Sequence, residues 1–213
     1  MTYRTNWAQS ERLDLCELLD RVGPDQDTLC GDWKTADLAA HIVLRERRPD
    51  AAGGIIIPAL AARTQRVMQE LKTLPWADLV DLIRQGAPRW NPMSLGPVDM
   101  IANTFEFFVH HEDVLRANPN WAPRNLDPEF EKLLWSRLKT SAPLLWRRAR
   151  VAVTLSNRID QVTAKKSKSS GGVLVTGDVG ELVLKSYGRT ACNVTVTGDD
   201  SEVAIFNETK LNV

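Results

Sequence analysis

The feature of this sequence that most constrains its fold is a change of pattern near residue 150. Before Arg150, apolar residues recur at steps of three and four, which is the spacing of amphipathic helices. After Arg150, short runs rich in valine and threonine, such as VAVTL and CNVTVT, are typical of β-strands. The pattern predicts an α+β chain in two parts: a four-helix bundle over residues 1–148, followed by a small α+β domain over residues 149–213.

Proline and glycine divide both parts into predicted elements. In the first part we expect loops at 50–58 and 86–97, and helices over residues 5–22, 35–48, 60–74, 76–84, 97–117 and 127–145. In the second part we expect a short helix that ends at Gly188, and strands over residues 151–155, 173–176, 192–197 and 202–206.

Charge and cysteine usage exclude several classes of protein. Lys and Arg together number 27, as do Asp and Glu, so the chain lacks the basic excess of a nucleic-acid-binding protein. No apolar run approaches the roughly 18–20 residues of a membrane span, and the polar N-terminus is unlike a secretory signal. Cys16, Cys30 and Cys192 lie far apart, which argues against disulfides or a cysteine-built zinc site. We expect a cytoplasmic monomer or homodimer with no nucleic-acid or membrane partner.

A polar stripe crosses the most apolar predicted helix. Asn103, Glu106, His110 and Asp113 are spaced three, four and three residues apart, which places them on one helical face. A carboxylate and an imidazole four residues apart project from adjacent turns and can bind one ion together. His111 points well away from this stripe, so we expect it to lie outside any site formed there.

One further histidine completes a candidate ligand set. His41 lies in another predicted helix, and with Glu106 and His110 it gives two imidazoles and one carboxylate. Such a set leaves an open coordination position, which is typical of catalytic metals, and it suits both zinc and iron. The alternative is that the Glu106–His110 pair is a structural ion pair and His41 a packed core residue.

Three other features have two possible interpretations. Cys30 is either a reactive thiol near a helix start or a buried small residue, and we favour the second. The basic clusters at 45–48 and 147–150 are either solvated helix ends or receivers for a carboxylate, and we favour the first. The seven tryptophans are expected to pack in the core. The sequence contains no HExxH metalloprotease motif, serine-hydrolase elbow or phosphate-binding glycine loop.

The order of the short motifs resembles a known family. Cys30-Gly31-Asp32-Trp33 and Asp37-Leu38-Ala39-Ala40-His41, followed by Glu106-x-x-x-His110-x-x-Asp113, are similar to the N-terminal domain of mycothiol-dependent maleylpyruvate isomerases. These enzymes belong to the DinB-like group of metal-binding four-helix bundles. The tail from Gly177 to Arg189 looks like the small sterol-carrier-like domain that follows in actinobacterial members.

The resemblance implies roles for particular residues. It places the metal ligands on His41, Glu106 and His110, and it gives Asp113 as a recurrent acidic position that could orient His110. Asn103, on the same polar stripe of the helix, is a second candidate for a contact that orients the ligands. Zn²⁺ is the first expectation for the divalent metal, with Fe²⁺ and Ni²⁺ as alternatives. Neither the catalytic residues nor those that would bind the thiol are identified by the motifs.

The expected function is that of a transferase or isomerase. It would depend on the metal, use a low-molecular-weight thiol such as mycothiol as co-substrate, and act on a small electrophilic substrate. The alternative is a non-catalytic protein that binds a metal or small ligand in a stress or regulatory role.

Overall fold

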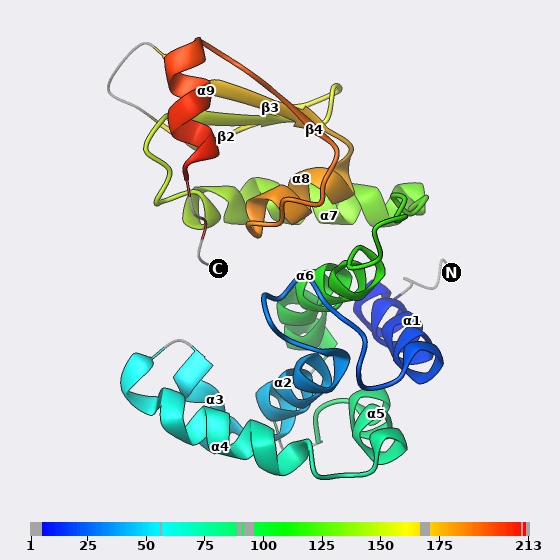
Figure 1. The fold of residues 1–213 in the computed structure, drawn as a ribbon. Helices are drawn as coiled ribbons and strands as arrows, with labels where there is room; N and C mark the ends of the chain where they lie inside the picture. The colour runs from blue at the N-terminus through cyan, green and yellow to red at the C-terminus, as the bar shows by residue number, and fades with distance from the viewer. Residues whose placement is uncertain are drawn as a thin grey trace. The chain divides into compact units, whose positions relative to one another are not determined.

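The structure is a computed structural model of the chain. It describes residues 6–55, 57–88, 91, 96–166, 171–209 and 211, with only the helical backbone given for 96–102. The chain divides into two compact units, Met1–Ala122 and Pro123–Val213. The first is helical and the second combines helices with one sheet, so the predicted α+β class is confirmed (Figure 1).

In the residues that the structure describes, the first unit is built of helices. Its elements are α1 (Trp7–Val22), α2 (Thr35–Arg47), α3 (Pro49–Ala52), η1 (Gly53–Ile55), η2 (Pro58–Leu60), α4 (Ala61–Leu71), α5 (Trp76–Gln85) and α6 (Gly96–Leu115). The expected loop at 50–58 is wrong in part, because α3 and two 3₁₀ turns occupy it; Pro49 sits in the first turn of α3, where its missing N–H costs nothing. Much of the expected loop at 86–97 lies outside the described residues.

The core of the first unit lies where four helices meet. Helix α1 packs against α5 and α6, and α2 packs against α4 and α5. Leu15, Leu38, Ile83 and Phe107, one from each of α1, α2, α5 and α6, are almost completely buried there. This packing fixes α2 and α6, the two helices that carry the candidate ligands.

A buried ion pair also lies among these helices. The guanidinium of Arg12 on α1 donates two hydrogen bonds of 2.6 Å to the carboxylate of Glu46 on α2, and one of 2.9 Å to the carbonyl of Ile83 on α5. The two charged side chains are only 3% and 1% exposed. Arg12 also lies over the ring of Phe107, 4.3 Å from its centroid, so one side chain connects four helices.

The described residues of the second unit form a four-stranded sheet and three helices. Its elements are α7 (Pro128–Leu145), β1 (Val153–Ser156), β2 (Gln161–Lys165), β3 (Val173–Gly177), α8 (Val179–Ser186), β4 (Val194–Thr197) and α9 (Asp200–Asn207). The strand order is β2-β1-β3-β4, in which β1 and β3 are parallel and the other pairs antiparallel. Helices α7 and α8 lie side by side and contact the sheet (Figure 1).

The units divide earlier than the sequence pattern predicts. The division falls at Ala122/Pro123, not between residues 148 and 149, because α7 packs against β2 and α8. Phe130, Leu134 and Leu138 form its buried face. The spacing of apolar residues predicted helix α7 correctly, but it does not identify the elements against which the apolar face of α7 packs.

Two predictions in the second unit need correction. The strand expected at 202–206 is helix α9, whose first turn carries Asp200 and Glu202, and acidic residues are favourable there. Strand β2 was not predicted, because Gln161–Lys165 is a short edge strand with little apolar alternation. Within the described part of the chain, no helix is long and apolar enough to span a membrane.

Candidate metal centre

Two histidines and one glutamate meet between α2 and α6. Nε2 of His41 lies 3.3 Å from Oε1 of Glu106, and Nε2 of His110 lies 3.2 Å from the same oxygen. Donor atoms of the three residues all lie within 4.8 Å of one another. Bonds of about 2.0–2.1 Å at tetrahedral angles would separate such atoms by about 3.3 Å, which the two distances to Glu106 match. That these side chains bind a cation stays a prediction.

The local sequence explains this convergence. Glu106 and His110 are four residues apart on α6, so their side chains project from adjacent turns of one face. His41 lies on α2, which the core fixes next to α6, and its ring centroid is 5.5 Å from that of His110. Trp33, which precedes α2, lies against the His41 ring with 5.2 Å between centroids. The site is therefore held by packed elements.

The opposite nitrogen of His110 faces a carboxylate. Nδ1 of His110 lies 3.0 Å from Oδ2 of Asp113, whose side chain is fully buried. A proton on Nδ1 would be donated to Asp113 and would leave Nε2 free to act as a ligand. This contact suits the orienting role expected for Asp113.

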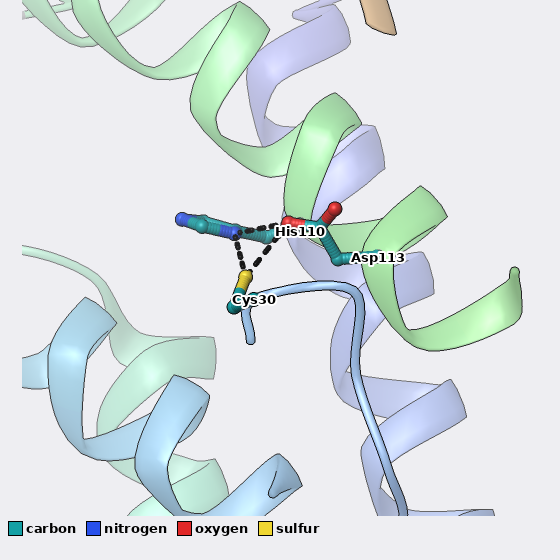
Figure 2. Close-up of side chains that lie close together, drawn as sticks. All are labelled: Cys30, His110 and Asp113. Atoms are coloured by element: carbon teal, nitrogen blue, oxygen red, sulfur yellow. Dashed lines mark hydrogen bonds and ion pairs between the residues drawn. The ribbon is translucent and has the colours of Figure 1, made fainter. Parts of the chain in front are cut away.

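Cys30 is the participant that sequence reasoning missed. Its Sγ lies 3.0 Å from Oδ2 of Asp113 and 3.9 Å from Nδ1 of His110. Figure 2 shows that the sulfur lies on the loop before α2 and points toward these two side chains of α6. The interpretation of Cys30 as a merely buried small residue is wrong, since it is half-buried and contacts a candidate ligand. Its nearness to Trp33 in the sequence was the available signal.

Arg45 and Glu46 are also placed differently from expectation. Arg45 donates a 2.5 Å hydrogen bond to Oδ1 of Asn103, and its Nε lies 3.6 Å from Oε1 of Glu106. Asn103 in turn donates to Glu46 at 3.3 Å. The cluster at 45–48 is therefore not simply a solvated helix end, because Arg45 lies one turn after His41 on the same face. Asn103, a candidate orienting residue, is the partner of Arg45 and Glu46.

The charges of the two central groups are shifted in opposite directions. Burial disfavours a charged Glu106, but hydrogen bonds from His110 and His41 and the charge of Arg45 outweigh it and hold the pKa of Glu106 well below its usual value. Burial likewise disfavours a charged His110, yet its contacts with Asp113, Cys30 and Glu106 raise the pKa of His110 well above 6.5. Without metal, the two therefore form an imidazolium–carboxylate pair at neutral pH.

This protonation makes metal binding pH-dependent in a defined direction. A cation must displace the His110 proton, so each binding event releases a proton and the apparent affinity rises with pH, by up to about tenfold per unit. An imidazole of ordinary pKa, about 6.5, would lose metal only below roughly pH 6. Because the pKa of His110 is raised, we expect metal to be lost here at a higher pH than for an ordinary imidazole. Competition with a chromogenic chelator from about pH 5 to about pH 9 measures it, and a loss confined to pH values below about 6 would contradict it.

The neighbouring histidine lies elsewhere, as helix geometry predicts. Nδ1 of His111 is 3.4 Å from Oε2 of Glu11 on α1, and both side chains are buried. His111 therefore belongs to the α1–α6 contact and offers a matched control for substitutions at His110.

The fold and this cluster define an α+β chain whose helical unit brings two histidines and a glutamate together. Solved structures with a similar fold are a mycothiol-dependent maleylpyruvate isomerase, with a TM-score of 0.62, and a mutant of that enzyme, with a TM-score of 0.60. Each is 13% identical, and each alignment covers 90% of both chains. No protein-family model and no curated protein matches the sequence. The resemblance drawn from the motifs is thereby confirmed for the fold.

Proposed function

We propose that this protein is a divalent-metal-dependent enzyme that uses a low-molecular-weight thiol to transfer or isomerise a small electrophilic substrate. The observation that carries the proposal is the meeting of His41 Nε2 and His110 Nε2 at Oε1 of Glu106. Two imidazoles and one carboxylate leave a coordination position for an exogenous ligand. Zn²⁺ is the first candidate, with Fe²⁺ and Ni²⁺ as alternatives.

The charges around the site favour an anionic ligand such as a thiolate. A bound divalent cation lowers the pKa of a coordinating thiol, which makes the sulfur nucleophilic at neutral pH. Arg45 adds a positive charge 3.6 Å from Glu106 and partly offsets that carboxylate. Its side chain is 19% exposed, so it is also the first candidate to receive a carboxylate of the substrate.

The similar structure supports a choice of thiol and substrate. It is described as a mycothiol-dependent maleylpyruvate isomerase. Mycothiol is therefore the first co-substrate to test, and maleylpyruvate the first electrophile. Whether the reaction is an isomerisation or a transfer depends on the electrophile that the protein accepts.

Metal content and turnover are measured on the same preparation. Protein purified without a polyhistidine tag or added metal is expected to carry about one cation per chain and to turn over one of a panel of electrophiles. Mycothiol, glutathione, cysteine and bacillithiol are each supplied as the thiol. His41→Ala is expected to abolish turnover, whereas His111→Gln retains it. Stoichiometric metal without turnover for any pair of thiol and electrophile would contradict the proposal that the protein is an enzyme. It would favour a non-catalytic metal-binding module.

A further inference from the structure

The imidazole of His110 has a carboxylate at each of its two nitrogens. Glu106 lies 3.2 Å from Nε2, and Asp113 lies 3.0 Å from Nδ1. On the Nε2 side a second imidazole, His41, completes a set of donors. On the Nδ1 side the thiol of Cys30 does so (Figure 2). One ring is thus shared by two groups of three donors that differ in chemical softness.

We propose that Cys30 Sγ, His110 Nδ1 and Asp113 Oδ2 form a second, alternative cation site that favours thiophilic divalent ions, with Cd²⁺ as the first candidate. This goes beyond the proposed function, since it requires neither turnover nor an exogenous thiol. His110 would then bind an ion through either of its two ring nitrogens, and the identity of the ion decides whether Nε2 or Nδ1 is used.

The distances support this assignment. The three donor atoms are separated by 3.0, 3.0 and 3.9 Å. Metal bonds of about 2.0–2.3 Å at tetrahedral angles place such atoms about 3.3–3.6 Å apart, so adjustments of a few tenths of an ångström suffice. Sulfur in the set favours soft and borderline ions over Mg²⁺ and Ca²⁺, which prefer oxygen.

The loop that carries Cys30 is anchored to the helix that carries the other two donors. The amide of Leu29 donates a 3.0 Å hydrogen bond to the carbonyl of Asp113. The hydroxyl of Thr28 accepts from the Cys30 amide at 3.1 Å and donates to the Trp33 carbonyl at 2.8 Å. The sulfur is therefore positioned before any ion arrives, and Cys30 itself is only half-buried.

The protons balance in this arrangement. Without the ion, the Cys30 thiol donates to Oδ2 of Asp113. Binding of the cation would release two protons to solvent, one from the Cys30 thiol and one from Nδ1 of the His110 imidazolium, and would place the ion on that nitrogen. The remaining ring proton then sits on Nε2, where Oε1 of Glu106 accepts it at 3.2 Å. The carboxylate on the far side therefore stabilises the tautomer that each site needs.

Charge-transfer spectroscopy separates the two sites, because only the Cys30 site contains sulfur. Reduced protein, freed of thiol reductant, is titrated with Co²⁺ and with Cd²⁺ alone. We expect a thiolate-to-metal absorption band that saturates at one ion per chain and survives in His41→Ala. Cys30→Ser should abolish the band, and Asp113→Asn should raise the ion concentration at half-saturation by roughly tenfold or more.

The other two cysteines are matched controls. Cys16 is buried in the helical core, where burial raises its pKa to about 11, and Cys192 lies in the second unit. Cys16→Ser and Cys192→Ser should both retain the band. X-ray absorption of the Cd²⁺-loaded parent needs no variant, and it should show a sulfur neighbour of the ion.

Two results would overturn the second site. One is a bound ion with no charge-transfer band and no sulfur neighbour, which would leave only the His41 side. The other is a band that persists in Cys30→Ser. Neither result bears on thiol-dependent turnover, and absence of turnover leaves the band expected, so the two proposals fail separately.

Discussion

Replacing His110 with alanine should remove bound metal completely and leave the helices in place. The imidazole supplies a donor atom to both of these groups of candidate ligands, so each of the two is left with two donors when it is lost. The fold does not depend on the ion, because the helical unit has its own core around Leu15, Leu38 and Phe107. In this it differs from a zinc finger, which unfolds without its metal.

The loss is measured as metal per chain by mass spectrometry on untagged protein. We expect about one ion in the parent and almost none in His110→Ala, with unchanged far-ultraviolet circular dichroism at 25 °C. Cooperative unfolding should persist at a lower midpoint, because Glu106 and Asp113 lose a charged partner. His111→Gln, one residue away, should keep its metal. Parent-like metal content in His110→Ala would contradict the assignment of both sites.

Replacing Glu46 with alanine should destabilise the protein by about 3–5 kcal/mol. The change leaves Arg12 charged and buried, with its two 2.6 Å hydrogen bonds to the carboxylate lost. It also removes the acceptor that Asn103 uses at 3.3 Å. Denaturant unfolding followed by circular dichroism gives the free energy, and the midpoint should fall while the transition stays cooperative.

Two further variants separate an uncompensated charge from a general packing defect. Asp20→Ala, which removes an exposed partner of Arg84, should cost only about 0–1 kcal/mol. The double variant Arg12→Met/Glu46→Leu removes both charges and fills the space, so it should recover most of the loss seen in Glu46→Ala. A double variant as unstable as the single one would show that the charge is not the cause.

The part of the candidate site that lies on a single helix could be predicted from the sequence. Glu106, His110 and Asp113 share one face because helix geometry fixes residues three and four apart. His41 was reachable by residue type, since the chain has only three histidines. Cys30 and Arg45 were not reachable in this way, because their places depend on a loop anchored at Asp113 and on the packing of α2 against its neighbours.

The fold was predictable to a similar extent. The apolar period located α1, α2 and α6, and valine-rich runs located β1, β3 and β4. The period could not tell that α7 covers the sheet, and the apolar run in 202–206 lacked the length to distinguish helix from strand. The first error concerns a tertiary partner, which no local pattern of the sequence encodes, and the second concerns a run too short for its period to be determined.

The division at Ala122/Pro123 has a consequence for how such a chain can change over time. Every donor of both cation groups, and Arg45 and Asn103 beside them, comes from the unit that precedes this division. A mutation in the sheet unit therefore leaves the identity of every candidate donor unchanged. Recombination at that point would transfer the complete set of candidate donors to a different partner domain in one event.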